Sequence, residues 1–291
     1  MTDIQSILID WYRQNARDLP WRAADRTAWG VLVSEMMLAQ TPVSRVEPVW
    51  TDWMQRWPSP AEMARAEPAE VIRRWDRLGY PRRALWLHEA AKTCVNRFSG
   101  QVPSTYDDLR SLTGVGDYTA SAVIAFAYGR RAVVLDTNVR RVLARIWRGS
   151  PGPKPHLTAT ERQMAAELVP EDDPTAASWA ISVMEFGALT CTAINPRCDE
   201  CPVQSHCNWD RAGRPSGPAR KTQKFAGTDR QVRGKLMAVL RTAHEPVPRA
   251  QLDLVWPDAI QRQRALDSLV ADGLVDPVHD EHFSLPTGID L

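Results

Sequence analysis

The sequence lacks the marks of membrane, secreted and repetitive proteins. No apolar run approaches the roughly 18 residues of a membrane-spanning helix, and acids and arginines interrupt the first residues, unlike a signal peptide. Its 5 cysteines are too few for a disulfide scaffold, and no segment repeats with a period of about 20–50 residues. We therefore expect an ordinary globular protein of the cytoplasm, without a membrane partner.

The chain also lacks a strong net charge. Its 36 Lys and Arg residues nearly balance 35 Asp and Glu residues, which leaves a formal net charge of +1. This balance disfavours a protein that coats DNA through a global positive field. A nucleic-acid site would therefore have to be a local basic patch.

What the sequence does contain is helical periodicity over most of its length. Apolar residues recur at three- and four-residue spacings before Leu19 and over 137–147, and stretches with Pro and Gly separate such segments. After a Gly-, Pro- and Ser-containing basic stretch, 211–228, three helical patterns precede two short strand patterns at 274–275 and 282–285. This order predicts a mainly α chain with a small winged-helix-like module at its C-terminal end.

A glycine-flanked turn lies near the middle of the chain. Gly114 and Gly116 let backbone amides approach a ligand closely, and the helix expected from Asp117 offers its unpaired N–H groups to an anion such as a phosphodiester. Arg82 and Arg83, in the first turn of another expected helix, oppose the helix dipole and also suggest an external anion. An ordinary helix–helix turn and a solvated basic corner are the respective alternatives.

Two acidic residues stand in contexts that suit catalysis. Glu35 lies among Val33, Met36 and other apolar residues, and such a setting raises a carboxyl pKa toward the value that a general acid needs near neutral pH. Asp136 ends an apolar run at the expected start of a helix, where it could face a developing positive charge. The alternatives are a Glu at the edge of a helix face and an Asp that only caps its helix.

Four of the cysteines are close together in the sequence, with the spacing C-x6-C-x2-C-x5-C: Cys191, Cys198, Cys201 and Cys207. Four thiolates at this spacing can hold one metal centre, and thiolates favour iron–sulfur clusters and zinc. Zinc ribbons tend to use two C-x2-C pairs, whereas this loop has one. The spacing therefore favours a 4Fe-4S cluster, with zinc as the alternative.

These features belong to seven motifs that, in this order, resemble the helix-hairpin-helix, iron–sulfur DNA glycosylases, and specifically the MutY-type adenine DNA glycosylases. The motifs are LPWR (19–22), SEMMLAQT (34–41), LGYPRRA (78–84), LTGVGDYTA (112–120), LDTNVRRVL (135–143), MEFGA (184–188) and the four-cysteine loop. The resemblance implies a two-lobed fold, a 4Fe-4S cluster on the four cysteines and double-stranded DNA as the partner. The regions implied are a glycosylase region, 1–210, with a six-helix barrel at about 28–135 and a cluster lobe of 1–27 and 136–210, then the basic linker, 211–228, and the winged-helix-like module, 229–291.

The resemblance also implies a two-carboxylate mechanism. Glu35 corresponds to the acid that protonates N7 of the extruded adenine, Asp136 to the carboxylate that stabilises the oxocarbenium-like sugar, and Asn138 to a residue that positions this carboxylate. Tyr118 stands where the strand-cutting endonuclease III branch has a lysine, which implies a monofunctional glycosylase with little lyase activity. The implied substrate-binding residues are Trp21, Arg22, Glu185, Gln40, Tyr80, Gly114 and Gly116.

Two departures from the MutY pattern concern the base opposite the adenine. Typical members read LQQT and LGYY, where this chain has Ala39 and Pro81 in place of a Gln and the second Tyr. They also commonly carry a larger NUDIX-like C-terminal domain, whereas residues 208–291 follow the cluster loop here.

We still expect removal of adenine opposite 8-oxoguanine or guanine, by a monomer that acts at the nucleoid. A uracil or thymine mismatch glycosylase of the same superfamily and a noncatalytic iron–sulfur DNA-binding regulator are the alternatives.

The C-terminal part offers two further candidate DNA contacts. Arg214, Arg220, Lys221 and Lys224 of the linker could follow a phosphate backbone, or belong to an ordinary solvated linker. In the module, the helix expected at 259–272 carries Arg262 and Arg264 and is the candidate for reading duplex DNA. A protein partner for the module is the alternative.

Overall fold

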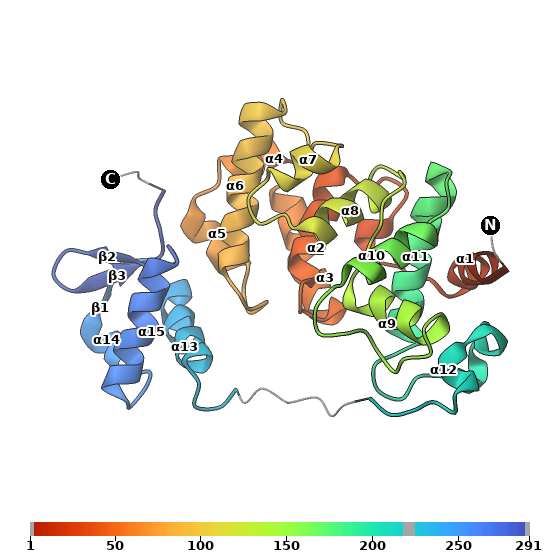
Figure 1. The fold of residues 1–291 in the computed structure, drawn as a ribbon. Helices are drawn as coiled ribbons and strands as arrows, with labels where there is room; N and C mark the ends of the chain where they lie inside the picture. Colours follow the sequence, from red (N-terminus) through yellow and green to blue (C-terminus); the bar gives the residue numbers. More distant parts are fainter. Residues whose placement is uncertain (1–2, 218–224, 289–291) are drawn as a thin grey trace. The chain divides into compact units, whose positions relative to one another are not determined.

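The computed structural model describes residues 3–217 and 225–288, and within them the chain is mainly helical, as predicted (Figure 1). Of the expected basic linker, Arg220, Lys221 and Lys224 lie outside the described residues. The α-helices before the cysteine loop are α1 (Asp3–Asn15), α2 (Ala28–Leu38), α3 (Val43–Arg56), α4 (Pro60–Ala64), α5 (Pro68–Arg74), α6 (Arg82–Arg97), α7 (Tyr106–Arg110), α8 (Asp117–Phe126), α9 (Thr137–Ile146), α10 (Ala159–Glu167) and α11 (Asp173–Leu189). A short 3-10 helix, η1 (Pro20–Arg22), follows α1.

The elements after α11 are shorter. The cysteine loop contains η2 (Cys198–Glu200), η3 (Gln204–His206) and α12 (Asn208–Arg211). The C-terminal module contains α13 (Asp229–Thr242), β1 (Val247–Pro248), α14 (Arg249–Asp253), α15 (Ala259–Ala271), β2 (Asp276–Val278) and β3 (His282–Ser284).

The described residues form two compact units, each built from several segments of the chain. The first unit consists of residues 3–35, 104–111 and 115–217, and the second of 36–103, 112–114 and 225–288. The first unit contains the described part of the expected cluster lobe, 3–27 and 136–210, with part of the expected barrel, and the second contains the rest of that barrel with the C-terminal module.

The core of the first unit lies among α1, α9 and α11. Leu8, Val142 and Phe186 are buried there, and the ring of Trp11 meets that of Phe186 edge to face with centroids 5.2 Å apart. Gly187 allows α11 to approach α9 closely, because a Cβ at this position would lie 2.8 Å from the Cβ of Asn138. The glycine of the MEFGA motif therefore serves the packing of the helix that carries Asn138.

Tryptophans fill part of the core of the second unit. Trp53 and Trp75 are fully buried, and their rings pack edge to face with centroids 5.5 Å apart. Helix α6 packs against α4 and α5 in the same unit. The tryptophans of the helices between residues 43 and 75 therefore contribute to the hydrophobic core of the second unit.

The C-terminal module has the helix and strand order of a winged helix. Its three strands form one antiparallel sheet in the order β1-β3-β2, with Val247 and Pro277 on either side of Phe283 (Figure 1). The expected strand at 274–275 begins two residues later, at Asp276, because the backbone N–H of Leu274 still donates to the carbonyl of Leu269 in α15.

The ends of two helices matter for the site. Helix α2 ends at Leu38, and Gln40 beyond it adopts a left-handed backbone with φ of 61°. Helix α9 begins at Thr137, directly after Asp136, as predicted. None of the helices formed by the described residues has both the length and the apolar character needed to cross a bilayer.

Candidate active site

Glu35 lies in the first unit, in the last turns of α2, and is only 5% exposed. Its carboxylate oxygen Oε2 accepts a hydrogen bond of 2.7 Å from the hydroxyl of Tyr118, near the start of α8. Burial, and after it the charge of Asp136, raise the pKa of Glu35 to about 7, although the Tyr118 hydrogen bond and Arg22 oppose the rise. The carboxyl is therefore available as a proton donor near neutral pH, which matches the expectation from its apolar neighbours.

Asp136 is the N-cap of α9, and it does more than cap the helix. Its Oδ1 accepts a hydrogen bond of 2.6 Å from the backbone N–H of Val139, and its Oδ2 accepts one of 2.8 Å from the amide of Asn138. Burial raises the pKa of Asp136, while the two hydrogen bonds and the charge of Arg141 work against this rise. The charge of Asp136 also raises the pKa of Glu35, which belongs to the same unit.

Arg141 fixes the orientation of Asn138, a role that the sequence did not indicate. Its Nη2 donates to Oδ1 of Asn138 at 2.8 Å and to the carbonyl of Gly187 at 2.6 Å, and its Nε donates to the carbonyl of Cys191 at 2.8 Å. Arg141 is 6% exposed. The sequence offered no signal that separates Arg141 from the neighbouring Arg140, which instead pairs with Glu161 at 2.7 Å.

Glu185 on α11 has a different environment from Glu35. It accepts hydrogen bonds from Arg17, at 2.7 Å and 2.6 Å, and from Arg22, at 2.9 Å. Burial alone would raise the pKa of Glu185, but the two guanidinium groups lower it to about 2. Arg17 is therefore a member of the site that the sequence did not indicate, because it stands outside every motif.

Arg22 retains a free hydrogen-bond donor. While its Nη2 binds Glu185, its Nη1 is buried and has no hydrogen-bond partner among the described residues. A buried N–H without a partner is costly, so a ligand that accepts from it gains affinity. The ring of Trp21, by contrast, is only 5% exposed and forms part of the core, which limits its use as a stacking platform.

The glycine-flanked turn leaves room for a ligand at only one of its two glycines. Gly114 has φ of +79°, and a Cβ there would lie 2.8 Å from the Cβ of Trp86, so the fold of the second unit itself requires this glycine. At Gly116 a Cβ would meet nothing within 4 Å, so the space beside the N-terminus of α8 is open. Leu112 and Val115 of the same turn are both buried.

Gln40 and Tyr80 both lie in the second unit and both have left-handed backbones, with φ of 61° and 49°. Arg83 ties the two turns together: it donates to the carbonyl of Ala39 at 2.8 Å and to that of Gly79 at 3.1 Å. The guanidinium is buried, and burial lowers the pKa of Arg83 to about 10.

The expected anion site at Arg82 and Arg83 is therefore wrong. Arg83 gives its N–H groups to backbone carbonyls, and Arg82 pairs with Asp272 at 3.1 Å. The charges at the start of α6 serve interactions inside the second unit.

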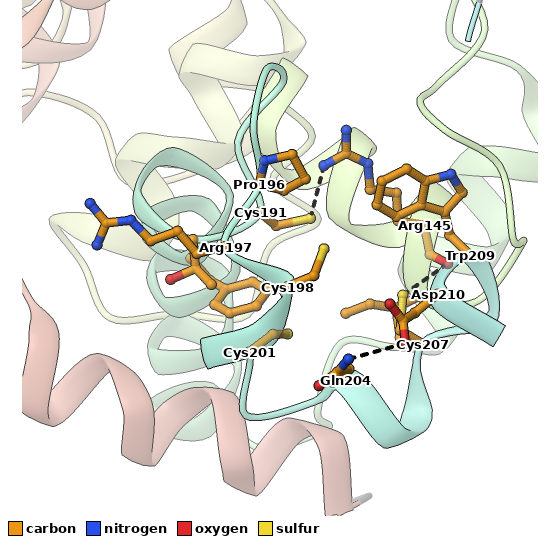
Figure 2. Close-up of a pocket in the computed structure, with 13 residues that line it drawn as sticks. Arg145, Cys191, Pro196, Arg197, Cys198, Cys201, Gln204, Cys207, Trp209 and Asp210 are labelled. Atoms are coloured by element: carbon orange, nitrogen blue, oxygen red, sulfur yellow. Dashed lines mark hydrogen bonds between the residues drawn. The ribbon is translucent and has the colours of Figure 1, made fainter. Parts of the chain in front are cut away.

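The four cysteines line a single cavity in the first unit. Figure 2 shows Cys191, Cys198, Cys201 and Cys207 around one open space, next to Arg145. Arg145 donates from Nη1 to the sulfur of Cys191 at 3.4 Å. Among the described residues, no three His, Cys, Asp or Glu side chains converge closely enough for a single metal ion. Four thiols around one cavity are a ligand set that suits an iron–sulfur cluster.

Comparisons with known proteins agree with this arrangement. Residues 33–168 match the model of the HhH-GPD superfamily base excision DNA repair proteins, and residues 191–207 match the iron–sulfur binding domain of endonuclease III. The adenine DNA glycosylase of Mycolicibacterium smegmatis is 51% identical over 96% of this chain and 94% of its own, and that of Mycobacterium tuberculosis is 47% identical over 96% and 92%.

Solved structures agree on the fold. A thermostable thymine-DNA glycosylase superposes with a TM-score of 0.65 at 25% identity, over 72% of this chain and 95% of its own. A trapped endonuclease III–DNA covalent intermediate superposes with a TM-score of 0.61 at 21% identity, over 73% of this chain and 99% of its own.

Proposed function

This chain belongs to the HhH-GPD superfamily of base excision DNA repair proteins, and we propose that it is an adenine DNA glycosylase that removes adenine mispaired with 8-oxoguanine or guanine. Its relatives at about half identity over nearly the whole chain carry that name. The proposal rests on the pair of Glu35 and Asp136. Glu35 has a pKa of about 7, and Asp136 accepts hydrogen bonds from Val139 and Asn138 and feels the charge of Arg141. A pure DNA-binding protein needs neither.

In the proposed reaction Glu35 gives its proton to N7 of the extruded adenine. The bond between C1′ of the sugar and N9 then breaks, and its electron pair leaves with the base. Asp136 lies opposite the positive charge that develops on the sugar, and Asn138 holds the carboxylate in place. A water adds to C1′ and loses a proton, which leaves an abasic site. Acid catalysis of this kind contributes a factor of about 10²–10⁴ to the rate.

Tyr118 accounts for the proposed lack of strand cleavage. A lyase of this superfamily needs an amine that attacks C1′ and forms a Schiff base. Tyr118 offers no amine, and its hydroxyl donates to Glu35 at 2.7 Å. We therefore assign Tyr118 to the orientation of the acid, and expect a monofunctional enzyme.

Arg22 and Glu185 are the proposed base-binding pair. Glu185 fixes one side of the guanidinium of Arg22, and the buried, unpaired Nη1 is left for an acceptor on the extruded base. Gly116 and the N-terminus of α8 are proposed to receive a phosphate, because the space there is open. Gln40 and Tyr80, on exposed left-handed turns of the second unit, are the proposed contacts to the strand opposite the adenine.

We propose that Cys191, Cys198, Cys201 and Cys207 hold the 4Fe-4S cluster of this chain, and the match of residues 191–207 to the iron–sulfur binding domain supports this assignment. When bound, the cluster supplies iron–thiolate bonds that cross-link the loop after α11. The hydrolysis proposed above uses the carboxylates, the base and water alone. We propose that the enzyme acts as a monomer on double-stranded chromosomal DNA.

The proposal is tested by single-turnover assays on duplexes with adenine opposite 8-oxoguanine, adenine opposite guanine, and uracil or thymine opposite guanine. Alkali then reveals the abasic sites. Release from the two adenine duplexes, lost in Glu35→Gln, supports the proposal. Release from the uracil or thymine duplexes alone would favour the activity named for the thymine-DNA glycosylase of similar fold. Binding without any release by cluster-replete protein would leave a noncatalytic regulator.

A further inference from the structure

The C-terminal module shares a hydrophobic core with α5. Val232, Leu236 and Leu240 of α13 are buried together with Ala69 and Ile72 of α5. Both segments belong to the second unit, so this contact lies within one compact body.

Polar contacts reinforce the attachment. Arg73 of α5 donates to the carbonyl of Ala243 at 3.0 Å, and Arg82 of α6 pairs with Asp272 at 3.1 Å. Arg241 of α13 donates to the carbonyl of Asp76. The module is therefore fixed against the helices on both sides of the turn that carries Tyr80.

The arginines of α15, the expected reading helix, are engaged inside the module. Arg262 pairs with Asp253 at 2.8 Å, and Arg264 forms two hydrogen bonds of 2.7 Å with Asp229. Each guanidinium thus has a carboxylate beside it, and the negative charge of this carboxylate weakens the attraction of the arginine for a phosphate. Helix α15 is therefore a poor candidate for electrostatic contact with DNA.

Arg230 of the module lies next to the aromatic ring of Tyr80. The guanidinium carbon of Arg230, in the first turn of α13, lies 4.9 Å from the ring centroid of Tyr80, and that of Arg83 lies 5.7 Å from the same centroid. Both distances fall within the range of a cation–π interaction, which extends to about 6 Å. Tyr80 is nevertheless 46% exposed, so its ring stays open to a ligand. Arg230 also lies 5.8 Å from the exposed ring of Phe225.

We propose that the C-terminal module acts on the duplex by holding Tyr80 in its pose through Arg230, and not by reading DNA with α15. The inference deepens the proposed function, because it takes Tyr80 as a contact to the strand opposite the adenine. Tyr80 needs such support because its own backbone is left-handed, a conformation that costs a non-glycine residue energy. Arg230 is then a positioning residue for Tyr80.

The test is a double-mutant cycle between Arg230→Gln and Tyr80→Ala. Adenine release measured against enzyme concentration gives both the affinity for the duplex and the maximal single-turnover rate. Arg230→Gln should weaken the affinity about 2- to 30-fold, the range expected for loss of one cation–π contact, and leave the maximal rate unchanged. In the Tyr80→Ala background the same change should have no further effect, because its target is gone.

Two variants complete the design. Lys235→Gln removes the same charge from the same helix, where Lys235 lies 5.0 Å from the ring of Trp256 inside the module, and should leave the affinity unchanged. Arg230→Lys keeps a cation and should recover part of the lost affinity. Thermal unfolding of all variants checks that the module stays folded.

Three results would overturn the inference. Equal losses of affinity in both backgrounds would mean that Arg230 contacts DNA itself. An Arg230→Gln variant that behaves like Lys235→Gln would mean that the contact with Tyr80 has no role in binding. A fall in the maximal rate at unchanged affinity would place Arg230 in the chemical step. Absence of adenine release from the wild-type protein would instead refute the proposed function, whatever Arg230 does.

Discussion

Glu35 and Glu185 are both buried in the first unit, with exposures of 5% and 0%, but their pKa values move in opposite directions. Around Glu35 the hydrogen-bond donor is a neutral hydroxyl, and burial raises its pKa to about 7. Around Glu185 two guanidinium groups donate, and they lower its pKa to about 2. Burial alone therefore does not decide whether a carboxyl is a proton donor or a fixed anion; the charge of its partners does.

The largest effect is expected from Glu35→Gln, which removes the proton donor and keeps the shape of the side chain. Single-turnover adenine release should fall by a factor of about 10²–10⁴. The amide can still interact with Tyr118, so the fold should be retained. Near-normal release by a folded Glu35→Gln protein would show that the raised pKa of this carboxyl has no catalytic use.

Glu185→Gln should instead act on stability. It leaves Arg17 and Arg22 without their anion, and one-sided loss of a buried ion pair costs roughly 3–5 kcal/mol. Because the side chain of Arg17 is 33% exposed, we expect about 2–3 kcal/mol in urea unfolding. The control is Glu70→Gln, whose exposed pair with Arg56 should contribute less than about 1 kcal/mol. Equal effects of the two changes would contradict the proposed difference between the sites.

The pH dependence of stability should separate the two glutamates further. Glu185 has a folded pKa below its unfolded value, so its contribution is present above pH 4.5 and is lost as the pH falls toward about 2. Glu35 has a folded pKa above its unfolded value, so its contribution is present below pH 4.5 and is lost as the pH rises to about 7. Relative to wild type, Glu185→Gln should therefore lose least at acid pH, and Glu35→Gln should gain stability toward neutral pH. Unfolding curves between these limits measure both trends, and parallel trends would refute the assignment.

The smallest effect is expected from Tyr118→Phe. The Tyr118 hydroxyl lowers the pKa of Glu35, so its removal should raise that pKa above about 7. Activity that needs the protonated acid falls as the pH rises through this pKa. The falling limb of the pH–rate profile should therefore move to higher pH, while the rate below the pKa changes by less than about tenfold. An unmoved limb would mean that the hydrogen bond does not tune the acid.

The sequence identified the residues that depend on local pattern. The apolar neighbours of Glu35, the position of Asp136 at the start of α9 and the spacing of the four cysteines are all visible in single windows of the chain. The helices themselves follow from apolar periodicity, and the resemblance of seven motifs placed them in one fold. The sequence did not predict strand β1, because its two residues are too few to form an alternating pattern.

Only the tertiary structure decided which charges meet. Arg17 binds Glu185 and Tyr118 binds Glu35 across long stretches of chain. Arg83, a candidate anion-binding residue in the sequence, is instead buried and connects the turns of Gln40 and Tyr80. A sequence states which groups can ionise, but their pKa values depend on distances to partners that the fold alone sets, because electrostatic interactions and desolvation act through space and not along the chain.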